Sequence, residues 1–140
     1  MKKSMTLLLF ALMAFVFSSC GEYTQTYYDQ EVIQLDLTAD RWTKHSSETM
    51  PVYYSASFDV PELTSYNFRT AVVSCELVYT DSRQPLPVTT HHMNGFGETW
   101  TRTVDFQYGL GYVSIYVTSS DFYDEVPEKM YFRLSILCAQ

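Results

Sequence analysis

Basic residues are scarce in this chain of 140 residues. Lys and Arg together number 9 against 16 Asp and Glu, and the formal net charge is −7. An acidic domain is repelled by the phosphates of DNA and RNA, so no nucleic-acid partner is expected. The same charge gives the domain no electrostatic attraction to anionic lipid head groups.

The motifs of common catalytic and cofactor sites are also missing. The sequence has no Gly-x-Ser-x-Gly elbow, no phosphate-cradling glycine loop and no His/Cys spacing of a zinc site. His91 and His92 are neighbours on an expected strand and face opposite sides, so they cannot share one metal ion. Asp121, Asp124 and Glu125 cluster in one loop, which is more typical of a solvated turn than of a calcium site. We therefore expect a protein that is not an enzyme and that holds no metal or cofactor.

Only one long apolar run is present. It is MTLLLFALMAFVF at residues 5–17, thirteen residues without a charge, and Lys2 and Lys3 precede it. As a helix this run would reach about 20 Å, too short for a hydrocarbon core of about 30 Å. A basic start, a short apolar stretch and small residues before a cleavage point are the plan of a secretory signal peptide. Removal of residues 1–19 would leave 7 basic and all 16 acidic residues, and thus a net charge of −9.

The segment Phe17-Ser18-Ser19-Cys20 resembles the lipobox of bacterial lipoproteins, whose cysteine is acylated and becomes the mature N-terminus. The two small residues and the cysteine match that motif, whereas Phe17 stands where Leu is usual. The resemblance implies lipidation of Cys20 and anchoring in the cell envelope, with the outer membrane as the expected location. Residues 20–30 would then be the lipidated cysteine and a polar tether. With the β-rich sequence that follows, the chain also loosely resembles small uncharacterised lipoproteins of Bacteroidetes-type bacteria, a likeness that brings no function.

From residue 31 onward, apolar and polar residues alternate with a period of two, which is typical of half-buried strands. The expected strands cover residues 33–37, 52–60, 70–80, 88–92, 100–108, 113–117 and 130–138. Turn residues at Asn94-Gly95 and at Gly109-Leu110-Gly111 predict two hairpins. Only residues 61–66 are expected to make a helical turn.

Seven short strands in 110 residues predict one all-β domain over residues 31–140. The expected architecture is a single antiparallel β-sandwich of about seven strands, immunoglobulin-like in arrangement. A small β-barrel is the alternative.

Two cysteines remain once Cys20 is set aside. Cys75 and Cys138 both have the parity of core residues on their strands. In an oxidising compartment they either form a disulfide, which would stabilise the fold by about 4 kcal/mol, or stay as two separate buried thiols.

Aromatic residues are abundant, with 12 Tyr, 9 Phe and 2 Trp. Six of them have the parity of core residues: Tyr54, Phe58, Tyr79, Trp100, Phe106 and Phe132. Tyr53, Tyr112 and Tyr116 have the opposite parity and lie among Ser and Thr. These three are the candidate ligand-binding residues, although exposed tyrosine is also simply a good strand former. The sequence therefore predicts a membrane-anchored envelope lipoprotein whose β-sandwich binds another protein. The alternative is a glycan-binding accessory lipoprotein that stacks sugars on these tyrosines.

Overall fold

The computed structural model describes residues 28–120 and 125–139. Within these ranges the chain forms nine strands, one short α-helix and one 3-10 turn. The strands are β1 (Tyr28–Leu37), β2 (Thr43–Ser47), β3 (Met50–Asp59), β4 (Val72–Val78), β5 (Arg83–Pro85), β6 (Val88–Met93), β7 (Thr99–Gly109), β8 (Tyr112–Ser119) and β9 (Met130–Ala139). The 3-10 turn η1 is Ala39–Arg41 and the helix α2 is Ser65–Thr70.

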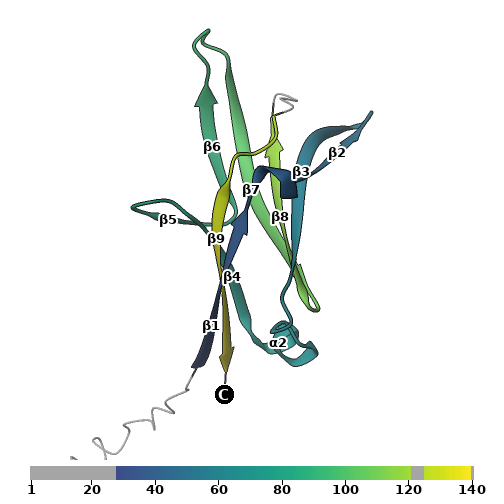
Figure 1. Ribbon diagram of the computed structural model, residues 1–140, viewed down its shortest axis with the longest axis vertical. Coiled ribbons are helices and arrows are strands. Elements are labelled where there is room, and N and C mark those ends of the chain that lie inside the picture. Colours follow the sequence, from purple (N-terminus) through teal and green to yellow (C-terminus); the bar gives the residue numbers. More distant parts are fainter. Residues whose placement is uncertain (1–27, 121–124, 140) are drawn as a thin grey trace, which may run out of the picture.

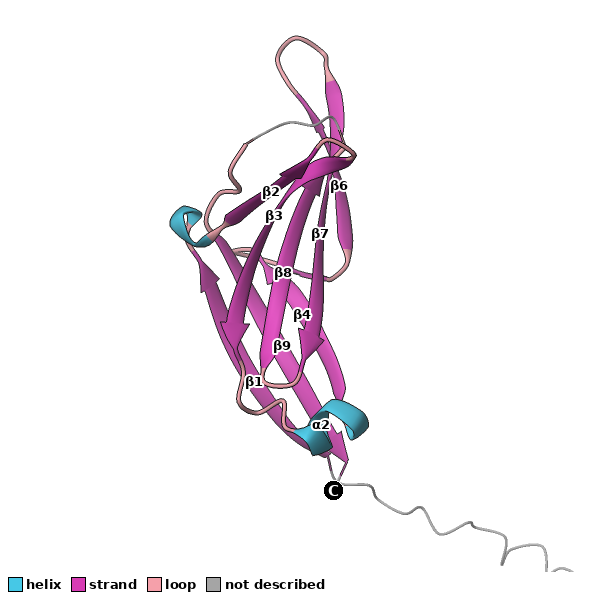
Figure 2. Ribbon diagram, turned by 90° about the vertical axis from the view of Figure 1, so that its right-hand side faces the viewer, coloured by secondary structure: helices cyan, strands magenta, loops and turns pink. Residues whose placement is uncertain are grey.

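The strands form two antiparallel sheets that face each other. The four-stranded sheet has the order β1-β9-β4-β5, and the five-stranded sheet has the order β2-β3-β8-β7-β6. Figure 2 shows the two layers, with β3, β8 and β7 in front of β9 and β4. The predicted β-sandwich is confirmed, and the barrel alternative is wrong because the two sheets do not join into one closed sheet.

The core lies between the sheets and follows the alternation of the sequence. In β8, Val113, Ile115 and Val117 are at most 2% exposed, and Phe132 and Leu134 of β9 face them from the other sheet. Burying such side chains is the main source of stability in a small sandwich. The remaining buried core residues are Leu35, Leu37, Trp42, Tyr54, Ala56, Val60, Leu63, Cys75, Leu77, Val104 and Ile136.

Several element boundaries differ from the sequence prediction. β1 begins at Tyr28, inside the segment expected to be tether, because its backbone pairs with β9 up to Ala139. β2 and β5 were not predicted, since neither has a buried residue that would show alternation. The helix begins at Ser65 rather than at Pro61, where the Thr64 side chain caps it by accepting a hydrogen bond from the Asn67 backbone at 3.2 Å.

The two described cysteines are free, so the disulfide alternative is wrong for this structure. Cys75 is paired across the ladder with Leu134, while Cys138 lies four residues further along the same neighbouring strand. Four residues of a strand span about 13 Å, well beyond the Cα separation of about 7 Å that a disulfide tolerates.

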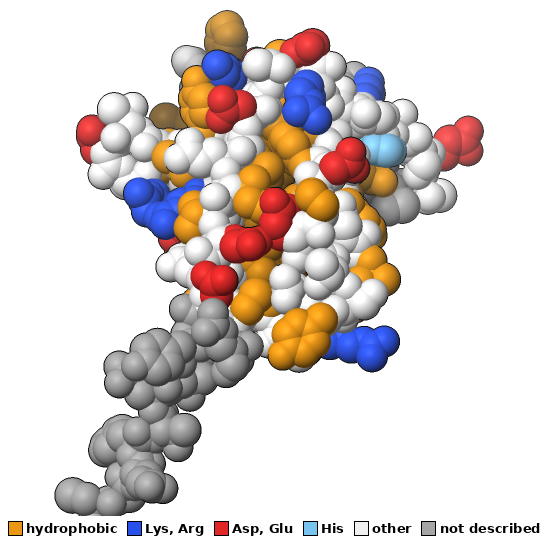
Figure 3. Space-filling view, turned by 60° about the horizontal axis from the view of Figure 1, so that its bottom comes forward, with side chains coloured by type: hydrophobic (Ala, Val, Ile, Leu, Met, Phe, Trp, Pro, Cys, Tyr) orange, Lys and Arg blue, Asp and Glu red, His pale blue; other side chains and the backbone are white. Residues whose placement is uncertain are grey.

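The sandwich has two distinct ends. The start of β1, the C-terminus and α2 lie at one end, and the β6–β7 hairpin extends from the other (Figure 1). At the α2 end, Tyr66, Phe68, Val72 and Leu110 are exposed, and Figure 3 shows apolar side chains there among charges of both signs. Neither helical segment of the described ranges has the length and apolar character needed to cross a membrane.

Candidate functional site

The outer face of the five-stranded sheet carries an unusual concentration of hydroxyl groups. Cross-strand register places the outward-facing side chains in continuous rows, of which Tyr53, Thr118, Thr103 and Thr89 form one. We define the hydroxyl face by these outward residues of the central rows: His45, Tyr53, Ser55, Ser57, Thr89, Thr103, Asp105, Gln107, Ser114, Tyr116 and Thr118.

An aromatic cluster lies on the β2 side of the hydroxyl face. The His45 ring stacks on Tyr53, with centroids 4.6 Å apart and planes inclined by 11°. Tyr53 is tilted by 49° against Tyr116 on the neighbouring strand, at a centroid distance of 6.2 Å. His45 Nε2 is also 2.8 Å from the Ser55 hydroxyl, which holds the imidazole in place. All three rings are half-buried, so each presents part of its surface to solvent.

Pairs of hydroxyl groups are hydrogen-bonded across neighbouring strands elsewhere on this face. Ser57 and Ser114 are hydrogen-bonded at 2.7 Å, and Thr89 and Thr103 at 2.9 Å. A hydroxyl donates one hydrogen bond and accepts two, so each pair keeps unused acceptor capacity for a ligand. The face therefore offers many hydrogen-bonding groups at fixed positions of the ladder.

Charge is nearly absent from the hydroxyl face. Among the outward strand residues whose register the structure describes, none of those paired across β3, β8, β7 and β6 is Lys or Arg. The acidic ones are Asp59 and Asp105, and the Asp105 carboxylate accepts a hydrogen bond from the Phe106 backbone at 2.7 Å. Covering this face would thus desolvate few ions.

Tyr112 lies away from the aromatic cluster. It lies four residues from Tyr116 on β8, about 13 Å away along the strand. Its ring covers Gly109 on β7 so closely that a Cβ at position 109 would overlap the ring. The structure therefore brings Tyr53 and Tyr116 together and leaves Tyr112, 40% exposed, with a packing role at the far end of the strand.

A second concave site lies between the sheets, near the base of the β6–β7 hairpin. This cleft has a volume of about 330 Å³. Its lining comes from the end of β4, the start of β9 and the inner faces of β6 and β7. The charged group that points into it from β7 is Arg102, whose side chain is 16% exposed.

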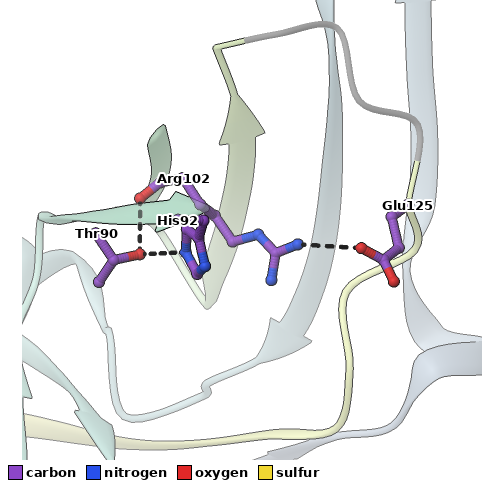
Figure 4. A network of polar contacts seen from close by, with 4 residues as sticks. All are labelled: Thr90, His92, Arg102 and Glu125. Atoms are coloured by element: carbon purple, nitrogen blue, oxygen red, sulfur yellow. Dashed lines mark hydrogen bonds and ion pairs between the residues drawn. The ribbon is translucent and has the colours of Figure 1, made fainter. Parts of the chain in front are cut away.

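A short polar network surrounds Arg102 (Figure 4). Its Nη2 lies 3.7 Å from Glu125 Oε2, and its backbone carbonyl accepts a hydrogen bond from the Thr90 hydroxyl at 3.3 Å. Thr90 Oγ1 is also 2.8 Å from His92 Nε2. Which of these two atoms donates depends on the tautomer of His92. The His92 ring in turn stacks on Trp100 at 5.4 Å.

The sequence prediction overlooked Arg102 as a site residue. The available signal was its parity, since Arg102 shares the inner side of β7 with Trp100 and Val104. A charged residue on the buried side of a strand normally requires a partner or a function.

The described residues offer little for nucleophilic or metal chemistry. Burial raises the pKa of the Cys75 thiol from 9.0 to about 12, which keeps it protonated and unreactive. Within residues 28–120 and 125–139 no group of three His, Cys, Asp or Glu side chains is placed to hold a metal ion. Asp121 and Asp124 of the acidic loop, and Cys20 of the lipobox, lie outside the described residues.

Comparison of the chain with protein-family models, with curated protein sequences and with solved structures gave no match.

Proposed function

We propose that this chain is a lipid-anchored envelope protein whose β-sandwich binds another protein through the hydroxyl face. The observation that carries this proposal is the combination of a tyrosine cluster, many hydroxyl groups and almost no charge on one exposed sheet surface. Protein interfaces are enriched in aromatic residues and depleted of charge at their centres. A standard interface buries roughly 800 Å² per partner, and the hydroxyl face extends over all five strands of its sheet.

The anchor is supported by the sequence and limits where the partner lies. β1 begins at Tyr28, eight residues after Cys20. Eight extended residues reach at most about 28 Å. A lipid on Cys20 would thus keep the domain close to the membrane, with the β6–β7 hairpin at the far end.

Site-specific crosslinking tests the binding surface. A photoreactive amino acid at Thr118, on the central strand of the hydroxyl face, should capture a discrete protein in intact cells. The matched control is Ser135, which is also half-buried and lies on the outer face of a central strand of the opposite sheet. Equal capture from both positions, or none from Thr118, would contradict the proposal.

The anchor has a separate test. Cys20→Ser should release the protein into soluble fractions or leave an unprocessed precursor, and it should abolish labelling with a palmitate analogue. Unchanged labelling would refute the assignment of Cys20.

A glycan-binding role is the second candidate, favoured by one observation. Tyr53 and Tyr116 lie side by side with Ser and Thr hydroxyls around them, an arrangement that suits sugar stacking and hydrogen bonding. A glycan array should then give a signal that Tyr53→Ala and Tyr116→Ala remove. Tyr66→Ala is the matched control, because Tyr66 is exposed on α2, away from both the hydroxyl face and the cleft. A blank array with the parent protein eliminates this candidate.

A further inference from the structure

Within the described ranges, Arg102 is a largely buried cation with one donor, Nε, that has no partner. A guanidinium has five N–H donors. In the described part of the chain, Arg102 Nε is buried without a hydrogen-bond partner, and the ion-pair contact of Nη2 with Glu125 is 3.7 Å long. That distance exceeds the length of a good charge-assisted hydrogen bond, which is about 2.7–2.9 Å. A desolvated guanidinium nitrogen without a partner favours an anion as its ligand.

The walls around Arg102 are mainly apolar. Leu77, Val88 and Met130 line the cleft together with Val104, which is buried in the core. The volume of about 330 Å³ is at the lower end of the range for small-molecule sites. A ligand that fits therefore has a small apolar body and one charged end.

Nearby acidic residues limit the charge of that end. Glu128 also lines the cleft, and Glu125 lies at its edge. Lys129, the second cation of the lining, points its Nζ at the Tyr131 ring, 4.9 Å from the centroid. One available cation with two carboxylates nearby favours a single negative charge over a dianionic phosphate.

From this geometry we infer that the cleft binds a small organic monocarboxylate. The carboxylate accepts hydrogen bonds from Arg102 Nε and an Nη in the bidentate manner, while the apolar body lies against Leu77, Val88 and Met130. The ligand carboxylate replaces Glu125, whose exposed side chain makes only a weak, solvent-screened contact. This site is separate from the hydroxyl face, since Arg102 points to the inner side of the sheet.

Methyl NMR on the full chain tests this inference. The chain carries Cys20→Ser, so that no acyl group competes for the cleft. The probes are hexanoate and its neutral analogue hexanamide, titrated at pH 7. Hexanoate should shift the methyl signals of Leu77, Val88 and Met130 saturably, and hexanamide should bind about tenfold or more weakly, since it lacks the charge-assisted contact.

Three variants identify the group responsible. Arg102→Met should make hexanoate bind no better than hexanamide. Arg133→Met, which removes the same charge from the outer face of the other sheet, should leave the preference unchanged. Glu125→Gln should strengthen hexanoate binding severalfold, because it removes the competing carboxylate.

Equal affinity of the parent protein for hexanoate and hexanamide would overturn the inference, as would shifts confined to methyl groups outside the cleft. If Arg102 serves only to hold Glu125 in place, Glu125→Gln should not strengthen hexanoate binding. If Arg102→Met does not fold, the acid–amide comparison and the Glu125→Gln titration still decide the question.

Discussion

The two sheets bury similar aliphatic side chains between them, yet their outer faces carry different chemistry. On the four-stranded sheet, Glu76 and Arg133 are cross-strand neighbours in the middle of the outer face. Asp36 and Arg83 continue the charged pattern on the edge strands β1 and β5. The hydroxyl face has tyrosine, histidine, serine and threonine at the corresponding central positions.

This difference indicates which surface can be covered. Ions cost free energy when they leave water unless they find partners, whereas hydroxyls and aromatic rings are desolvated at lower cost. The charged outer face thus suits permanent exposure and discourages edge association. The hydroxyl face suits contact with a partner, and the following predictions test the contrast.

The largest expected effect is the difference in alkylation rate between a thiol on the inner face and a thiol on the outer face of β4. Ser74 and Cys75 are neighbours on β4, one exposed and the other 2% exposed. Because burial raises the pKa of Cys75 from 9.0 to about 12, its thiolate fraction near pH 8 falls about a thousandfold. Alkylation of Cys75 should be slower by at least this factor than that of an ordinary thiol, and should rise about tenfold per pH unit below pH 12.

The control for this measurement is Ser74→Cys in a Cys20→Ser, Cys75→Ala, Cys138→Ser background, followed by mass spectrometry. The introduced thiol should react at an ordinary rate. Rapid native-state labelling of Cys75 would show that the assignment of inner and outer faces is incorrect.

The next effect is on partner capture. Thr118→Arg places a cation beside Tyr53 on the hydroxyl face. Covering that cation without a partner group should lower affinity by about tenfold or more, measured as loss of crosslinked product from a neighbouring photoreactive position. Ser135→Arg on the other sheet should leave capture unchanged, and equal loss from both variants would remove the contrast between the faces.

A smaller effect concerns Tyr112 and Gly109. Tyr112→Ala should lower the free energy of unfolding by about 1–2 kcal/mol, because the ring covers the Gly109 backbone. Gly109→Ala should also destabilise, since the new Cβ overlaps the ring. The double variant should be less unstable than the sum of the two, as measured by urea unfolding. Strict additivity would mean that the ring and the glycine do not interact.

The smallest effect is expected from the Ser57–Ser114 pair. Ser57→Ala should cost about 1 kcal/mol of unfolding free energy, because it leaves the buried Ser114 hydroxyl without this partner. Ser57→Ala combined with Ser114→Ala should recover most of that loss, since no polar group is then left unpaired. A double variant less stable than Ser57→Ala would contradict this account.

Alternation in the sequence was sufficient to predict seven strands and the inward direction of residues such as Ile115 and Phe132. It did not reveal β2 or β5, because short exposed edge strands have no buried face to mark them. It also assigned Tyr79 to the core, whereas β4 ends at Val78 and Tyr79 is 48% exposed.

The hydroxyl face and the cleft were also predictable only in part. The shared face of Tyr53 and Tyr116 follows from parity and strand pairing, but the contact with His45 depends on the unpredicted β2. The inward parity of Arg102 was visible in the sequence. Its cleft was not, since it depends on where the ends of β4 and β9 lie relative to β6 and β7.

The pairing of Tyr28 with Ala139 has a practical consequence. The described chain begins and ends at the same end of the sandwich, so a capture tag at the carboxyl end would emerge beside the proposed tether. On a biosensor chip, such a tag would hold the domain in the orientation proposed for the living cell, with the β6–β7 hairpin directed into the analyte flow.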